Sequence, residues 1–236
     1  MTGRLIAPGT VTDTTGDARW APVRVTALLA EPVVGLAQHP GALDGPAAFG
    51  AYQSALAAGD RFDPIPAAWA LDFALPLATW TRPHPGGGDA RLGAADPAHA
   101  WGWACSRALY DTDAHTAVQI RRKPATAQMA RFAPDAKHHA GLGPYKARDT
   151  LHPAVAARRV HWFALADPRA LEELLAHVTH LGRAARHGNG RVLAWDVAAD
   201  PQAHEGWARR PFPHPGGSLD AIRAPYWHPS RRLPCR

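Results

Sequence analysis

The sequence has little cysteine and no long apolar run. Its 236 residues include only two cysteines, Cys105 and Cys235, too few for a disulfide scaffold or a cysteine-based zinc site and typical of a reducing compartment. The best apolar stretch, residues 67–80, is interrupted by Asp72 and Pro76, and no stretch approaches the ~20 apolar residues that a membrane span needs. The N-terminal residues lack the apolar core of a signal peptide. We therefore expect a cytoplasmic protein with no membrane partner.

The common signatures of metal-dependent and hydrolytic enzymes are also missing. The sequence contains no His-Glu-x-x-His, no Gly-x-Ser-x-Gly and no Gly-x-x-x-x-Gly-Lys-Ser/Thr pattern. A metal-dependent enzyme or a common hydrolase therefore has almost no support, and we expect no cofactor and no metal site. The chain nevertheless has enough apolar material, 46% hydrophobic residues, for one large core or two small ones.

The charge is unevenly distributed along the chain, whose formal net charge is +6. Residues 1–100 hold 6 Lys and Arg against 9 Asp and Glu, whereas residues 118–160 hold 9 against 2 and residues 181–236 hold 9 against 4. Two basic segments that follow a mildly acidic N-terminal segment indicate a surface that faces a polyanion. Arginine abundance alone is weaker evidence, because an alanine- and arginine-rich composition also follows from GC-rich coding.

The clearest helix in the sequence begins after residue 167. Asp167 is a suitable N-cap and Pro168 suits the first helical position. Gly182 is predicted to end the helix as the glycine that follows its last turn. The residues between them form one apolar stripe at helical spacing, namely Leu171, Leu174, Leu175, Val178 and Leu181.

The loop that follows, residues 180–192, is rich in glycine and arginine and is called the glycine loop below. Its Gly-x-Gly pattern lies after a helix and before a strand, the reverse of the order in dinucleotide-binding folds. The C-terminal end of a helix repels phosphate, so any anion must be held by loop N–H groups and by Arg183, Arg186 and Arg191. Composition alone does not decide between this interpretation and an ordinary helix cap followed by a turn with solvated arginines.

The order of predicted elements indicates an α+β fold of the ferredoxin-like, or RRM-like, type. A strand at residues 23–29, a helix from Asp44 as N-cap to Gly59 and a strand at residues 69–75 supply half of a β-α-β-β-α-β unit. Strands at residues 160–165 and 192–197, on either side of the helix and the glycine loop, supply the other half.

We therefore divide the chain into five segments. Residues 1–21 are a flexible lead-in, and residues 22–79 and 158–200 are the two halves of the ferredoxin-like domain. Residues 80–157 form a basic insertion with a hairpin near residues 111–113, and residues 201–236 form a Pro- and Arg-rich C-terminal segment.

The glycine loop also carries a resemblance to a known family. The pattern Leu-Gly-x-x-x-x-x-Gly-x-Gly-Arg-Val, here residues 181–192, resembles the RAMP superfamily of CRISPR-associated proteins, in which this loop contacts CRISPR RNA. Residues 43–52, 143–147, 195–197 and 210–213 narrow the resemblance to the type IV effector subunit of the Cas-five type. The resemblance covers about residues 22–215.

The resemblance implies a RAMP fold with a thumb-like insertion and a non-catalytic, RNA-binding structural role. Such a subunit holds the five-prime handle of the CRISPR guide RNA and caps the filament of backbone (Cas-seven-type) subunits, and a large subunit is a further possible partner. The RNA-binding residues carried over from the loop motif are Gly182, Arg183, Arg186, His187, Gly188, Asn189, Gly190 and Arg191. Residues of the insertion chosen for their charge and place are Arg121, Arg122, Lys123, Tyr145, Lys146 and Arg148.

Two alternatives remain open at this stage. Trp101 and Trp103 are candidates for stacking on RNA bases, but their strand-like surroundings favour core packing. A metal-independent endoribonuclease that processes precursor CRISPR RNA is the rival function, because histidine titrates in the range needed to deprotonate a 2′-hydroxyl. The cluster to test for that activity is His138, His139, Tyr145 and Lys146.

Overall fold

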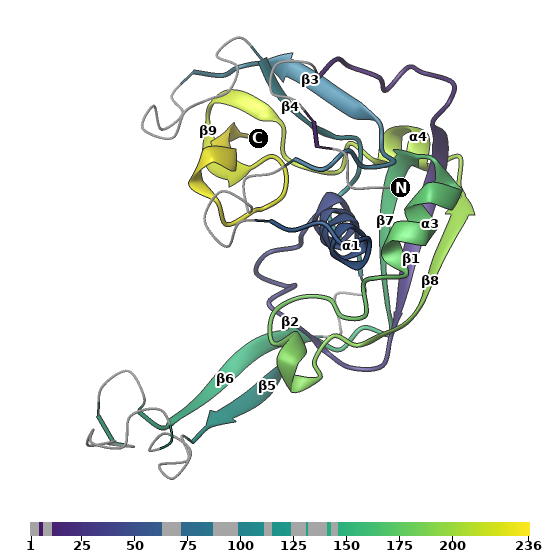
Figure 1. The fold of residues 1–236 in the computed structure, drawn as a ribbon. Helices are drawn as coiled ribbons and strands as arrows, with labels where there is room; N and C mark the ends of the chain where they lie inside the picture. The colour runs from purple at the N-terminus through teal and green to yellow at the C-terminus, as the bar shows by residue number, and fades with distance from the viewer. Residues whose placement is uncertain are drawn as a thin grey trace.

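The computed structural model describes residues 5–6, 11–62, 72–86, 99–110, 115–123, 131, 141–142 and 146–236. The fold is mixed α+β, with strands dominating (Figure 1). No helix of the described residues is long and apolar enough to cross a membrane.

A three-stranded antiparallel sheet lies at the centre, in the order β7-β1-β8. Its strands are β1 (Ala21–Leu29), β7 (Arg159–Ala166) and β8 (Val192–Ala199), and all three were predicted from the sequence. In β1 every second side chain from Val23 to Leu29 is buried, so one face of the sheet forms the core.

The free edge of β7 is completed by two short segments instead of one strand. Residues 76–78 bond to its C-terminal end, where the Ala78 N–H donates to the Leu165 carbonyl at 2.8 Å. Residues 104–109 continue along the edge, with antiparallel bridges from Cys105 to Ala164 and from Leu109 to His161. A hairpin of β3 (Thr79–Pro83) and β4 (His99–Trp103) lies between these segments in the sequence. The strand predicted for residues 69–75 is therefore wrong for residues 72–75, where only Phe73 makes a bridge, to Leu5.

Two helices cover the inner face of the central sheet (Figure 1). They are α1 (Asp44–Ala57) and α3 (Pro168–Leu175). Asp167 caps α3 as predicted, because its carboxylate accepts from the Ala170 N–H at 3.1 Å. The prediction that α3 continues to residue 181 is wrong: residues 178–181 turn away to bond with residues 190–195, and Trp195 Nε1 donates to the Val178 carbonyl at 2.9 Å.

The prediction that Asp44 is the N-cap of α1 is also wrong, because its carboxylate does not cap the helix. The side chain is fully buried and accepts hydrogen bonds from the Tyr226 hydroxyl and, at 2.8 Å, from the Ala224 N–H. Burial and the Asp44 charge raise the pKa of Tyr226 well above its ordinary value. The sequence pattern placed Asp44 correctly at the start of a helix but could not show that the C-terminal segment folds over it.

Arg210 is the buried cation of the same cluster. Its guanidinium donates to the carbonyls of Trp103, at 2.8 Å, and of Ile222. Burial alone lowers the pKa of Arg210, but the neighbouring Tyr226, Cys105 and Asp44 outweigh that effect, so the net shift is upward. The cluster ties residues 210–226 to β4 and α1.

The C-terminal segment, predicted only as Pro- and Arg-rich, contains regular structure. It consists of a short helix α4 (Ala203–Gly206), a 3-10 turn η5 (Pro229–Arg231) and a hairpin of β9 (Pro213–Ala221) with β10 (Arg232–Cys235). Ile222, Leu233 and Cys235 pack with Trp80 in a second, smaller core.

A second sheet, in the order β2-β6-β5, projects from the body as an arm (Figure 1). The arm consists of β5 (His115–Arg122) and β6 (Arg148–Val155), and β2 (Val33–Val34) pairs with the body end of β6. The arm lies within the predicted insertion. The hairpin predicted near residues 111–113 falls outside the described residues, and the partner of β5 is β6, more than 25 residues later.

Residues 11–20, predicted as part of a flexible lead-in, contact the β3 strand. Thr14 accepts from the Thr79 N–H at 2.9 Å, and Asp13 accepts from the Thr81 N–H at 3.1 Å. Partial burial acts to raise the pKa of Asp13, but hydrogen bonds from Thr15 and Thr81 lower it overall.

Candidate nucleic-acid interface

The glycine loop is a compact turn closed by main-chain hydrogen bonds. The Leu181 N–H donates to the Gly190 carbonyl at 2.8 Å, and His180 and Arg191 form an antiparallel bridge. Between these ends the chain makes one 3-10 turn, η4 (Ala185–His187). The backbone has positive φ at four residues, Gly182, Ala184, Gly188 and Gly190.

Two of these glycines are required by space as well as by backbone angle. A Cβ on Gly190, whose φ is +70°, would lie 2.0 Å from the Leu181 carbonyl oxygen. A Cβ on Gly182, whose φ is +75°, would lie 2.6 Å from the Val34 carbonyl oxygen. No side chain fits at such separations, so glycine is the only residue that allows this path.

The loop is joined directly to the body end of the arm. The Arg183 N–H donates to the Val34 carbonyl at 3.0 Å, and Val34 pairs with Ala154 of β6. The N–H of the next residue, Gly35, donates to the Pro153 carbonyl at 3.1 Å. Because Gly35 has no side chain, the Arg183 side chain can pack against its backbone. The arm and the loop therefore share one backbone framework.

The loop arginines are exposed to solvent. Arg183, Arg186 and Arg191 are exposed, and none forms an ion pair with another residue that the structure describes. Arg186 Nε donates to His187 Nε2 at 3.3 Å, which fixes the two side chains as neighbours. Three guanidiniums with free forks on a rigid loop are suited to bidentate contact with phosphate.

The arm carries the second group of predicted residues at its outer end. Arg122 lies directly opposite Arg148 in the β5-β6 register, a like-charge pair that disfavours the hairpin by itself. Arg121, one residue before, is partly neutralised by Asp149 at 3.1 Å. Lys123 and Lys146 are exposed just beyond the strands, while Tyr145 lies outside the described residues.

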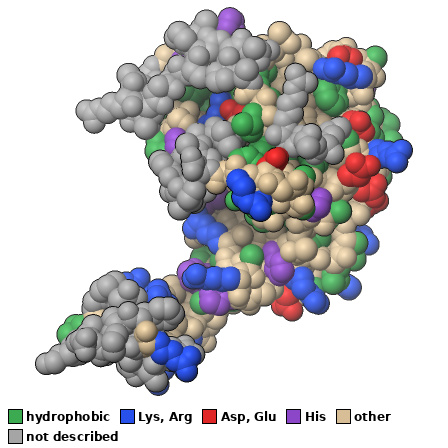
Figure 2. All heavy atoms as spheres, viewed as in Figure 1, with side chains coloured by type: hydrophobic (Ala, Val, Ile, Leu, Met, Phe, Trp, Pro, Cys, Tyr) green, Lys and Arg blue, Asp and Glu red, His purple; other side chains and the backbone are tan. Residues whose placement is uncertain are grey.

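The two predicted groups lie at opposite ends of the arm. Seven residue steps separate Val155 at the body from Arg148, which at the usual rise of a strand is roughly 23 Å. Figure 2 shows Lys and Arg side chains on the arm and where it joins the body, whereas the Asp and Glu side chains in that view lie on the body. The described basic residues of the glycine loop and of the arm therefore form two groups, one at each end of the arm.

The predicted stacking tryptophans belong to the core. Trp103 is only 5% exposed, and the half-buried Trp101 packs against it with ring centroids 5.7 Å apart. The Arg223 guanidinium covers Trp101 at 4.1 Å from the ring centroid. Core packing, the alternative favoured by the sequence, is thus confirmed for both.

Sequence reasoning missed Val34 and Gly35, whose main-chain groups hold the loop against the arm. The available signal was a glycine directly after two apolar β-branched residues, which indicates close approach of another segment.

The expectations about metal binding and the rival nuclease cluster concern His, Cys, Asp and Glu side chains. Among the residues that the structure describes, no group of three His, Cys, Asp or Glu side chains is placed to hold a metal ion. His138 and His139, the histidines of the rival nuclease hypothesis, lie outside those residues.

Comparison with known proteins identifies the family. No curated protein matches the chain. The family described as CRISPR type IV associated protein Csf3 matches residues 107–235, more than half of the chain, a range that includes the arm, the glycine loop and the C-terminal hairpin. The chain belongs to the Csf3 family of CRISPR type IV associated proteins.

Proposed function

We propose that the chain is a non-catalytic RNA-binding subunit of a type IV CRISPR ribonucleoprotein complex. In this role it holds the five-prime handle of the guide RNA and caps the filament of backbone subunits. The observation that carries the proposal is the glycine loop. It presents three exposed arginines that form no ion pair within the described part of the chain, on a backbone whose path requires Gly182 and Gly190, at the base of a basic arm.

The strand order supports a RAMP-type, ferredoxin-like core. β8, β1 and β7 lie side by side in antiparallel order, and α1 and α3 lie on one face. Residues 76–78 and 104–109 occupy the place of the fourth strand, on the outer edge of β7. This is the arrangement expected of a β-α-β-β-α-β unit whose second strand is interrupted by a hairpin.

The arm supports the RNA role through its charge. Arg122 and Arg148 face each other across the hairpin, and their repulsion is relieved when a phosphate lies between them. The backbone of single-stranded RNA supplies such phosphates at regular spacing, and its 2′-hydroxyls give Asn189 and the loop amides a means to distinguish it from DNA.

Replacing Arg183 and Arg186 together with alanine is expected to weaken binding of repeat-derived RNA by at least about tenfold. The log–log salt slope of the affinity should become shallower by about 1.4, because each phosphate contact in single-stranded RNA contributes about 0.7. Fluorescence anisotropy over a series of salt concentrations measures both quantities.

The matched control is the double variant Arg169→Ala/Arg232→Ala, which removes two exposed arginines from α3 and β10. It should change neither quantity appreciably. Equal losses in the two double variants would mean that only net charge matters, and an unchanged Arg183→Ala/Arg186→Ala variant would overturn the loop assignment.

RNA incubated with the protein in the absence of divalent metal is expected to stay intact, because the proposed role includes no chemistry. A native gel should show a shifted complex, and a denaturing gel of the same sample should show full-length RNA. A discrete cut that disappears in His138→Ala or His139→Ala would contradict the proposal and establish the processing endoribonuclease instead.

A further inference from the structure

The face of the central sheet opposite α1 and α3 is covered only in part. Its side chains on β1 are Arg24, Thr26 and Leu28, because the alternate residues point into the core. At one end of this face Gly206 of the short helix α4 lies against the Phe163 ring, and the Arg209 guanidinium lies 5.3 Å from the centroid of the same ring. Beyond that end, the face forms a hollow among the residues that the structure describes.

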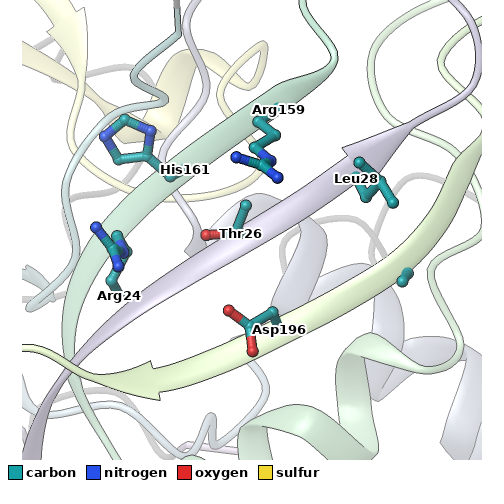
Figure 3. A pocket seen from close by; sticks show the side chains of 7 residues that line it. Arg24, Thr26, Leu28, Arg159, His161 and Asp196 are labelled. Carbon is teal, nitrogen blue, oxygen red and sulfur yellow. The ribbon is translucent and has the colours of Figure 1, made fainter.

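The open part forms a hollow of about 410 Å³, called the open-face hollow below. In the strand register Thr26 lies between His161 and Asp196, and Leu28 lies between Arg159 and Ala194. Figure 3 shows these side chains rising from three adjacent strands, with Arg24 and Arg159 on one side of Thr26 and Asp196 on the other. The lining residues are Arg24, Thr26, Leu28, Arg159, His161, Ala194 and Asp196.

The hollow holds unpaired charges of both signs. Arg24 is already engaged, 3.6 Å from Asp200. Arg159 and Asp196, in contrast, form no ion pair or side-chain hydrogen bond with any residue in the described part of the chain. A ligand that satisfies both must carry an anionic group and N–H donors.

His161 lies on β7, two residues after Arg159, and adds a further polar group to the hollow. Burial, followed by the positive charges of Arg24 and Arg209, lowers the pKa of His161, and Asp200 opposes this only in part. The shift favours the neutral imidazole, which offers one donor and one acceptor. Leu28 and Ala194 supply apolar surface beside it.

Main-chain hydrogen bonds bring one end of the hollow close to the glycine loop. The Ala30 N–H donates to the Arg191 carbonyl at 2.9 Å, and the Leu29 N–H donates to the Arg158 carbonyl at 2.9 Å. The Leu28 end of the hollow therefore lies beside the junction of the loop with β8. Arg158 and Arg159 are exposed cations next to this junction, and Arg159 lines the hollow.

We propose that the open-face hollow binds one unpaired nucleotide of the guide RNA and selects against uridine. This inference rests on the proposed RNA-binding function and adds a base-reading site to it. The phosphate lies on Arg159, the base covers Leu28 and Ala194, and the Watson–Crick edge of the base meets the Asp196 carboxylate.

The carboxylate explains the selectivity. Guanine presents two adjacent N–H groups to a carboxylate, and adenine and cytosine each present an amino group. Uracil presents one N–H between two carbonyl oxygens, which the Asp196 carboxylate repels. An acidic peptide is a poorer occupant, because it would satisfy Arg159 while placing a further carboxylate beside Asp196.

The test is a uridine scan of repeat-derived RNA, in which each nucleotide other than uridine is replaced in turn by uridine. Fluorescence anisotropy measures the affinity of the full-length protein for each of these RNAs. For the unmodified protein we expect one position where uridine weakens binding by roughly tenfold. Asp196→Asn should remove that penalty, because the amide also donates to a uracil oxygen. Arg159→Ala should weaken binding to every RNA in the scan by roughly fivefold and make the salt slope shallower by about 0.7.

The control variants are Arg169→Ala and Glu172→Gln, exposed residues of α3 away from the open face. Neither should alter the scan. The assignment of the open-face hollow is overturned if uridine weakens binding at no position. It is also overturned if Arg159→Ala binds RNA normally while Arg183→Ala/Arg186→Ala is impaired; in both cases the proposed RNA-binding function is unaffected. If the unmodified protein binds no repeat-derived RNA, the proposed function and the nucleotide site are both contradicted. If Arg159→Ala impairs assembly with backbone subunits but not RNA binding, the hollow is a protein contact and the inference is wrong.

Discussion

Replacing Gly190 with alanine is expected to destabilise the protein by roughly 2–4 kcal/mol and to abolish most of its RNA affinity. The new Cβ would lie 2.0 Å from the Leu181 carbonyl oxygen, and main-chain atoms cannot yield as the end of a flexible side chain can. Relief requires breaking the bond between the Leu181 N–H and the Gly190 carbonyl, which closes the loop. Urea unfolding measures the first effect and anisotropy with repeat-derived RNA measures the second.

Gly188→Ala is the matched control, since it separates backbone strain from collision. Gly188 has a similar φ of +83°, but nothing lies within 4 Å of the position of its Cβ. The Gly188→Ala variant should lose only about 1 kcal/mol of folding stability and keep most of its RNA affinity. Equal effects of the two substitutions would mean that the close approach at Gly190 does not determine the shape of the loop.

Asp44→Asn is expected to destabilise the protein by roughly 3–5 kcal/mol, the cost of leaving a buried charge without its counterpart. The Asp44 carboxylate is fully buried and is the negative charge of the cluster that contains Arg210. The Tyr226 hydroxyl and the Ala224 N–H donate to different oxygens of the carboxylate, so an amide at this position would also place its NH₂ group against one of these two donors. Thermal unfolding should show a fall in Tm on the order of 10 °C.

Two further variants identify the cause of that loss. Glu172→Gln removes an exposed carboxylate and should change stability by less than about 0.5 kcal/mol. The double variant Asp44→Asn/Arg210→Met should lose less than the sum of the single losses, because it removes both charges together. Additive losses would show that hydrogen bonding at Asp44, not charge pairing with Arg210, carries the stability.

The spacing of apolar residues correctly predicted those strands and helices whose buried side chains follow the local sequence pattern. The strands at β1, β7 and β8 alternate or concentrate apolar residues over eight or nine positions, and α3 has both a capping Asp167 and an apolar stripe. The stripe also predicted the burial of Val178 and Leu181, although these residues lie past the helix. The apolar pattern therefore predicted which residues are buried. It did not predict where α3 ends, because the helix ends where its main chain begins to form hydrogen bonds with the segment that leads into β8.

The missed elements depend on partners distant in the sequence. β9 contains two prolines and two glycines, which disfavour a strand. Among the described strands β9 pairs only with β10, and a strand paired on one side tolerates these residues because fewer of its N–H groups are needed. The arm pairs residue 115 with residue 155, so neither strand carries a local signal of the other.

The sequence predicted a glycine loop with solvent-facing arginines, but it did not predict how that loop is attached to the rest of the fold. The glycine and arginine content of residues 182–191 indicated an anion-facing loop, and the structure leaves its arginines exposed and without ion pairs among the described residues. The attachment of that loop to Val34, and the opposition of Arg122 and Arg148, arise from sheet register. Nothing in the sequence near Arg159 or Asp196 indicated that β1 would place them across one hollow.

The cluster around Asp44 also constrains how the protein is made. Asp44 is separated from its donors Ala224 and Tyr226 by 180 and 182 residues. During synthesis α1 therefore leaves the ribosome well before the residues that donate to its buried carboxylate. Until those residues follow, Asp44 lacks both donors. Contacts of such long sequence separation form slowly and leave the incomplete chain prone to aggregation.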